Sequence, residues 1–283
     1  MKNMKKKESF YIPDTGVSYP EKPDEHLHAR TGGAAFTIDK DYPFWNRSIA
    51  FRWKSGWLYA GIFTLVFPLN RLRFALKIKG RSILRKHKAL FKNGALTVSN
   101  HIHRWDFLMV LQAVRYRKLY FPAWKENLTG PDRTLIRLAG GIPVPTDIHT
   151  IKYFNQAFDD LHEKKKWMHV FPESANWHYY PYIRPFKKGI FALAYKYNIP
   201  VLPMAFSFRP PSGVYKLLDA LFKKNASGGG GGSHLITLSI GEPIAPDRTL
   251  PRKEAVTLLR KKCHESMIAL AGIERNPWPA EGD

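Results

Sequence analysis

The stretch Asn100-His101-Ile102-His103-Arg104-Trp105-Asp106 decides the fold, because it directly follows the apolar run 95–99, ALTVS. A short apolar run of this kind is typical of a buried strand, and residues 105–114 have the pattern of a helix. His101 and Asp106 are five positions apart, which would put them about 140° apart on one helix. We therefore expect His101 in the turn and Asp106 in the first helical turn.

That arrangement has a chemical consequence. The Asp106 carboxylate can accept a hydrogen bond from one imidazole nitrogen of His101, which fixes the tautomer and leaves the other nitrogen as a base. The N–H groups at the start of the same helix suit a developing negative charge. A metal site is one alternative, since the order His-x-His-x-x-Asp contains three metal-binding residue types. A non-catalytic histidine at a helix cap is the other.

Strand-like and helix-like segments alternate through the rest of the chain. The expected strands are 118–124, 141–145, 167–172, 199–206 and 234–240, and the expected helices are 131–140, 151–161, 188–197, 214–222 and 252–271. This alternation predicts an α/β fold with a mostly parallel central sheet flanked by helices. Ser99 and Pro172 both lie at carboxyl ends of strands, where open sheets of this class bind ligands.

The composition indicates a polyanionic partner. The 283 residues include 45 Lys and Arg against 23 Asp and Glu, a net charge of +22, which suits anionic lipid or nucleic acid. No helix-turn-helix, zinc-finger or RNA-recognition signature is present, so we do not expect nucleic acid as the partner. Cys263 is the one cysteine, which fits a reducing compartment.

The N-terminal part of the chain indicates which of these two polyanions is the partner. Residues 55–70 carry no charge and are flanked by Arg52, Lys54, Arg71 and Arg73. Sixteen residues is shorter than the roughly 20 that a spanning helix needs. Tryptophans at one edge favour the headgroup level of a membrane. We expect a helix bound at the cytoplasmic face of a membrane, peripheral or monotopic, with a buried core helix and one short span as alternatives.

These observations divide the chain into four parts. Residues 1–41 form a polar N-terminal arm, and 42–75 form the membrane-associating helical segment. Residues 76–272 form the α/β domain, which contains a flexible Gly-rich loop at 225–233. Residues 273–283 form a C-terminal tail.

Four blocks in this order resemble the glycerophospholipid acyltransferase family. The first is Asn100-His101 with Asp106 five positions after the histidine, and the second is WKENL (124–128) with GGIPV (140–144). The third is Phe171-Pro172-Glu173, followed by FKKG (186–189), and the fourth is IPVLP (199–203). Each block alone is weak, but their order and spacing together are specific.

The resemblance implies transfer of a fatty acyl group to a lysophospholipid hydroxyl, such as that of 1-acyl-glycerol-3-phosphate. The donor would be an acyl thioester, acyl-CoA or acyl carrier protein, with no further cofactor and no metal. His101 and Asp106 would be catalytic. The implied substrate-binding residues are Asn100, Lys125, Glu173, Ser174, Lys187 and Lys188. For Glu173, a carboxylate that holds the loop through backbone or arginine contacts is the alternative.

The chain also departs from the family pattern at two places. Pro145 or Thr146 stands where an arginine usually contacts the acceptor phosphate, and Ser174-Ala175-Asn176 replaces the usual Gly-Thr-Arg. Arg133, Arg137, Lys187 or Lys188 are the candidate substitutes. These departures leave open a different lysolipid or polar lipid acceptor, or a family member that binds lipid without transferring an acyl group.

Overall fold

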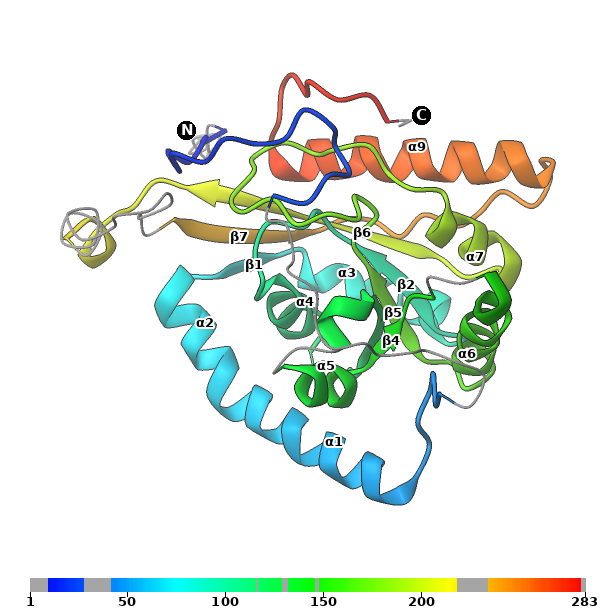
Figure 1. Cartoon of the computed structure of the whole chain (residues 1–283). Coiled ribbons are helices and arrows are strands. Elements are labelled where there is room, and N and C mark those ends of the chain that lie inside the picture. The colour runs from blue at the N-terminus through cyan, green and yellow to red at the C-terminus, as the bar shows by residue number, and fades with distance from the viewer. Residues whose placement is uncertain are drawn as a thin grey trace.

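A seven-stranded sheet forms the centre of the protein in the part described by the computed structural model, residues 10–27, 42–115, 117–128, 132–145, 148–217 and 234–280 (Figure 1). Its strands are β1 (Lys77–Lys79), β2 (Ala95–Val98), β3 (Leu119–Ala123), β4 (Gly141–Pro143), β5 (Trp167–Val170), β6 (Val201–Arg209) and β7 (Leu235–Ile240). Their order is β1-β7-β6-β2-β5-β3-β4. The β6–β7 pair is antiparallel and the other neighbours are parallel, as predicted for an α/β fold.

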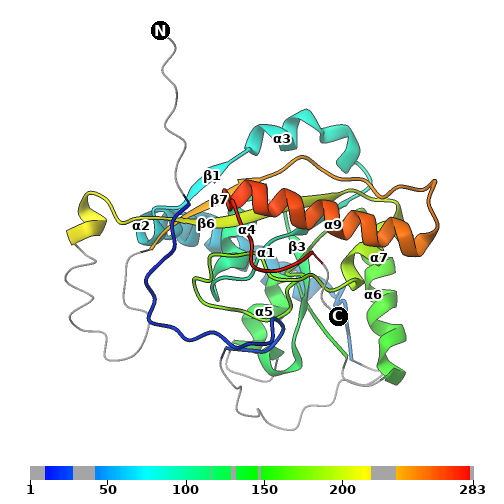
Figure 2. The ribbon, with the colours of Figure 1, turned by 90° about the horizontal axis from the view of Figure 1, so that it is seen from above.

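Helices cover both faces of the sheet and form two hydrophobic cores (Figures 1 and 2). One core contains buried residues of α6 (Ile151–Glu163), α7 (Gly189–Tyr197) and α9 (Arg252–Ala271). The other contains buried residues of α4 (Asp106–Val114), α1 (Ile49–Gly61) and α2 (Phe67–Phe74). Because helices pack on both faces, the central strands are buried on both sides, which explains their continuous apolar sequences.

Most predicted elements are present, and two were not predicted. The structure adds β1 and α3 (Arg81–Lys86), and it has short 3-10 turns at Lys88–Phe91, Lys125–Leu128 and Ile148–Thr150. The predicted helix at 131–140 is α5 (Arg133–Ala139). Of the helix expected at 214–222, residues 214–217 are helical and the rest lies outside the described residues, as does the Gly-rich loop 225–233.

The uncharged segment is helical, with a π-helical turn (Ile62–Val66) between α1 and α2. Pro68 explains this turn, because proline has no N–H to donate to the carbonyl four residues earlier. Ser55 and Tyr59 anchor α1 by donating hydrogen bonds to the carbonyls of Leu138 (2.6 Å) and Ala139 (2.7 Å). Of the helices described, none combines the length and the apolar character needed to cross a membrane.

The register of the sheet brings two predicted motifs together. Val98 of β2 is paired with Val170 of the adjacent parallel strand β5. The segments that follow, 99–101 and 171–173, therefore leave the sheet side by side at its carboxyl edge. This is the position expected for a ligand site in an open parallel sheet.

Candidate active site

His101 and Asp106 meet at the carboxyl end of β2, where the chain turns into α4. Nδ1 of His101 lies 2.6 Å from Oδ2 of Asp106. The Asp106 side chain is 1% exposed and that of His101 is 21% exposed. A buried carboxylate thus holds an accessible imidazole. This is the predicted arrangement, and it leaves Nε2 of His101 as the nitrogen for a substrate.

The same carboxylate shapes the turn between strand and helix. Oδ2 of Asp106 also accepts the backbone N–H groups of Ile102 (3.0 Å) and His103 (3.2 Å). These two N–H groups are therefore engaged and are not donors for a developing oxyanion. Both residues precede α4, and the expectation that N–H groups at the start of α4 hold a developing oxyanion stays a prediction.

Two neighbours from the loop after β5 orient the imidazole ring. Phe171 stacks on His101, with ring centroids 4.0 Å apart and planes at 13°. The side-chain amide of Asn176 lies 3.2 Å from Nδ1 of His101. The Nδ1–H of His101 donates to Asp106, so Nδ1 cannot also accept a hydrogen bond. The Asn176 amide can therefore pair with this N–H only through its oxygen. Asn176 stands where the family resemblance leads us to expect an arginine.

Glu173 forms a buried ion pair with Arg184 and holds the backbone of His101. Its Oε2 accepts Nη2 of Arg184 (2.8 Å) and the N–H of His101 (3.1 Å), and its Oε1 accepts the N–H of Arg184 (2.9 Å). The two side chains are 2% and 0% exposed. These contacts are the ones expected for the alternative role of Glu173, in which its carboxylate holds the loop. The contact of Glu173 with an acceptor stays a prediction.

The side chain of Asn100 holds two strands together beside the site. Its side chain donates to the carbonyl of Phe206 (3.2 Å) and accepts the N–H of Phe206 (2.8 Å), and the residue is fully buried. Both ends of its amide are thus used to tie the end of β2 to β6. The contact of Asn100 with substrate stays a prediction.

The other predicted substrate-binding residues lie around the same edge. Ser174 is partly buried, with φ of 69°, and its N–H donates to the carbonyl of Phe171. Lys187 and Lys188 are exposed just before α7, and Nζ of Lys187 contacts Asp24 at 2.7 Å. Lys125 begins the 3-10 turn after β3, and its side chain is outside the described part. Substrate binding by these four residues remains a prediction.

Two other histidines near His101 are buried and neutral. Burial lowers the pKa of His103 to about 4 and that of His169 to about 3. Nδ1 of His103 accepts the N–H of Trp105, and His169 contacts Thr97 and Ser99. His103 therefore serves the turn in the His-x-His-x-x-Asp stretch. Among the residues described, no group of three or more His, Cys, Asp or Glu side chains is arranged to hold a metal ion.

The candidate substitutes for the missing phosphate-binding arginine differ in their surroundings. Arg137 donates to the carbonyls of Phe44 (3.2 Å) and Gly141 (3.0 Å), and it also contacts the carbonyl of Pro43. Arg137 is thus committed to the backbone that precedes α1. Lys187 is instead exposed, and its Nζ contacts the carboxylate of Asp24.

Comparisons with known proteins identify the domain that contains this site. A family model described as "Acyltransferase" matches residues 75–207, which include His101, Asp106 and Glu173. The chain is also 27% identical over 167 residues to an uncharacterized acyltransferase of Schizosaccharomyces pombe. Residues 75–207 therefore match the acyltransferase family model, which agrees with the acyltransferase resemblance that the motifs predicted.

The extent of the similarity is partial. The match to the S. pombe protein covers 54% of this chain and 56% of that protein, so the chain spans little more than half of this relative. Among solved structures, the crystal structure of the 1-acyl-sn-glycerophosphate (LPA) acyltransferase PlsC from Thermotoga maritima is similar over 80% of this chain and 92% of that chain. The TM-score is 0.47 and the sequence identity 17%.

Proposed function

We propose that this protein is a membrane-surface O-acyltransferase. It transfers a fatty acyl group from acyl-CoA or acyl carrier protein to the hydroxyl of a lysophospholipid such as 1-acyl-glycerol-3-phosphate. The observation that carries this proposal is the 2.6 Å contact between Nδ1 of His101 and the buried carboxylate of Asp106. It lies within the acyltransferase domain, at the sheet edge where ligands bind.

The chemistry follows from the free nitrogen of this pair. Nε2 of His101 takes the proton of the acceptor hydroxyl while the oxygen attacks the thioester carbonyl. The new C–O bond forms, the C–S bond breaks, and the imidazolium returns its proton to the thiolate. Asp106 stabilises the imidazolium in between. A base positioned in this way contributes about 10²–10⁴-fold to the rate.

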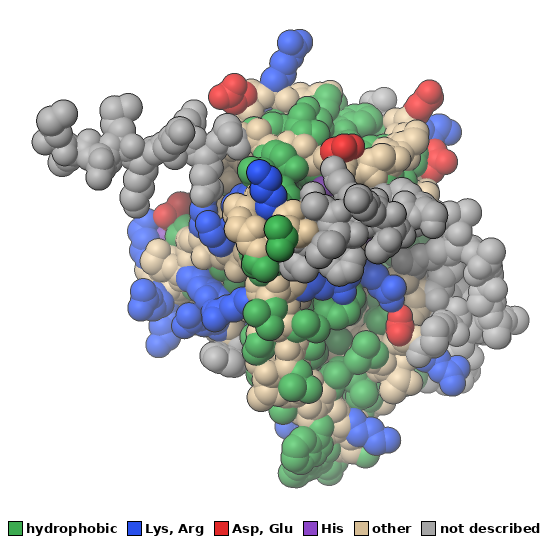
Figure 3. Space-filling model, turned by 90° about the vertical axis from the view of Figure 1, so that its left-hand side faces the viewer, with side chains coloured by type: hydrophobic (Ala, Val, Ile, Leu, Met, Phe, Trp, Pro, Cys, Tyr) green, Lys and Arg blue, Asp and Glu red, His purple; other side chains and the backbone are tan. Residues whose placement is uncertain are grey.

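The outward side of α1 and α2 supports binding to a lipid surface. Together with the π-helical turn between these helices, it carries exposed apolar side chains, namely Ile49, Trp53, Trp57, Leu65, Leu69 and Leu72. Lysine and arginine side chains lie beside a band of hydrophobic side chains on this part of the molecule (Figure 3). Apolar side chains that enter the headgroup region, together with basic side chains that attract anionic lipids, are the features of an interfacial helix.

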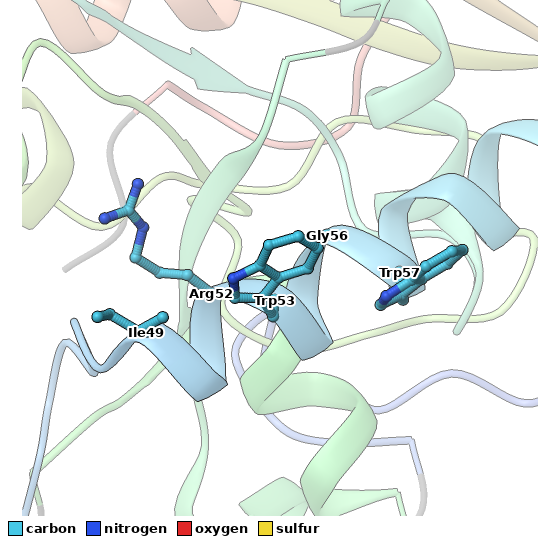
Figure 4. A pocket seen from close by; sticks show the side chains of 5 residues that line it. All are labelled: Ile49, Arg52, Trp53, Gly56 and Trp57. Carbon is cyan, nitrogen blue, oxygen red and sulfur yellow. The ribbon is translucent and has the colours of Figure 1, made fainter.

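A shallow hollow on α1 suits this contact. It has a volume of about 530 Å³ and is lined by Ile49, Arg52, Trp53, Gly56 and Trp57. The indole rings of Trp53 and Trp57 project from the same side of the helix, and Gly56, between them in sequence, leaves space (Figure 4). Trp53 and Trp57 are 68% and 74% exposed. Tryptophan favours the headgroup level, so we expect these rings to enter it.

An acceptor panel tests the activity. Purified protein is incubated with labelled acyl-CoA and, in parallel, with lysophosphatidic acid, zwitterionic lysolipids and glycerol 3-phosphate. We expect an acylated lysolipid from the natural protein and none above background from His101→Ala. His87→Ala, which changes a histidine paired with Glu242 outside the site, is the matched control and should retain activity. Full activity of His101→Ala would remove this base from the mechanism.

Vesicle sedimentation tests the lipid surface. Trp53→Ser combined with Trp57→Ser should release the protein from vesicles that contain anionic phospholipid. Leu90→Ser is the control, because Leu90 is also an exposed apolar side chain but lies outside α1 and α2. Unchanged sedimentation of the double variant would show that this face is not the anchor.

A further inference from the structure

A segment of the N-terminal arm is built into the loop that carries Glu173. Residues 19–26, here called the strap, lie against residues 177–187 (Figures 1 and 2). The carbonyl of Glu25 accepts Nε1–H of Trp177 (2.8 Å), and the carbonyl of Pro23 accepts Nη1–H of Arg184 (2.6 Å). Both side chains are buried, so the strap backbone satisfies donors that would otherwise lack a partner.

The strap is connected to the catalytic base through these contacts. Arg184, which donates to the strap, also binds Glu173, and Glu173 accepts the N–H of His101. At the other end of the strap, His26 packs edge-on against Trp124, with ring centroids 5.5 Å apart. Trp124 directly follows β3, so the strap reaches from the end of β5 to the end of β3. It therefore borders the carboxyl edge of the sheet.

Within the strap, Asp24 forms an ion pair with Lys187, a lysine beside the site. Its Oδ2 lies 2.7 Å from Nζ of Lys187, and the side chains are 47% and 55% exposed. The hydrogen bond from Lys187 lowers the pKa of the Asp24 carboxyl. The N–H of Lys187 donates to the carbonyl of Pro172, which places this lysine next to Glu173. An exposed pair of this kind is weak, so another anion can replace the carboxylate at small cost.

We infer that Lys187 binds the phosphate of the acceptor and that, in the unliganded protein, the Asp24 carboxylate occupies the position of that phosphate. The inference rests on the proposed function, because it takes a phosphate-bearing lysolipid as the acceptor. It accounts for the missing arginines, since Asn176 and Pro145 cannot provide a charge and Arg137 and Arg184 are committed elsewhere. A phosphate, which carries more charge than a carboxylate, displaces Asp24 from Lys187, while the backbone contacts of the strap with Trp177 and Arg184 remain.

Binding of glycerol 3-phosphate, measured by calorimetry at fixed salt on the full chain, tests this inference without acyl transfer. Asp24→Asn should tighten binding by up to about fivefold, the range expected for removing one weak competing pair. Lys187→Gln should weaken it about tenfold, because a charge-assisted hydrogen bond is lost. In the Lys187→Gln background, Asp24→Asn should have no further effect.

Glu21→Gln is the matched control, because it removes the same charge from another exposed carboxylate of the strap. It should leave binding unchanged. The inference is overturned if Asp24→Asn binds like the natural protein, if Glu21→Gln tightens binding equally, if Lys187→Gln has no effect, or if neither the natural protein nor Asp24→Asn binds glycerol 3-phosphate.

The acyl-transfer assay separates this inference from the proposed function. If the binding pattern holds but no acyl group is transferred to any acceptor, the phosphate site stands and the proposed reaction fails. If acyl transfer occurs but the binding pattern is absent, the reaction stands and the role of Asp24 and Lys187 fails. With both correct, Asp24→Asn lowers the KM for lysophosphatidic acid with little change in kcat.

Discussion

Glu173 accepts the backbone N–H of His101 at 3.1 Å, so the carboxylate at the end of β5 holds the residue that follows β2. The same carboxylate is paired with Arg184 in a site that excludes water. Two motifs that are 72 positions apart in the chain are thereby locked together. Glu173 is thus placed to position His101.

Glu173→Gln should destabilise the protein strongly. It removes the charge that compensates the buried Arg184 guanidinium, and breaking a buried pair from one side costs about 3–5 kcal/mol. Urea unfolding measures the loss in the free energy of unfolding. The double variant Glu173→Gln, Arg184→Met should recover part of it. A variant as stable as the natural protein, with only a raised KM for the acceptor, would instead show that Glu173 acts by contacting substrate.

Asn100→Ala should lower stability for a related reason. It leaves the buried N–H and C=O of Phe206 without partners, and we expect a loss of about 2–3 kcal/mol. Asn155→Ala, an exposed asparagine on α6, is the control and should change little. If Asn100→Ala unfolds at the same urea concentration as the natural protein and yet loses activity, then Asn100 contacts substrate after all.

The buried histidines should make the fold sensitive to acid. Burial lowers the pKa of His103 to about 4 and of His169 to about 3, below the 6.5 of an unfolded histidine. Between these values the unfolded chain binds more protons than the folded one. Stability is therefore complete above pH 6.5 and falls below it, by about 2 kcal/mol for each histidine at pH 5.

Urea unfolding at pH 7, 6 and 5 measures this loss. His169→Gln keeps a side chain that can hydrogen-bond with Thr97 but does not titrate, so its stability should fall less steeply with pH. An identical pH dependence in the variant and the natural protein would contradict the assignment of His169 as a buried neutral group.

Local patterns in the sequence were sufficient for much of the fold. Buried parallel strands such as β2 and β5 are short apolar runs, and α9 begins and ends where its pattern does. β1 was not predictable in this way, because Lys77-Ile78-Lys79 has the sequence of an exposed segment. It forms a strand because β7 offers it a free edge, and charged residues are common on edge strands.

The site was predictable to the extent that its residues lie close together in sequence. His101 and Asp106 share one turn, so their spacing predicted the contact. Arg184 and the strap could not be found in this way, because their contacts with Glu173 and Trp177 depend on how distant loops fold back. The one signal for Arg184 was its position in the apolar context of Ile183 and Phe186, which suggests a buried charge that needs a partner.

The central claim is that His101 and Asp106 act as one unit on the acceptor hydroxyl, and a double-mutant cycle on kcat for acyl transfer tests it most directly. His101→Ala and Asp106→Asn, each confirmed as folded by circular dichroism, should each lower kcat by about 10²–10⁴-fold. The double variant should be no slower than the slower single variant, because residues that act as a unit are not additive. A double variant whose loss equals the product of the two single losses would contradict this account.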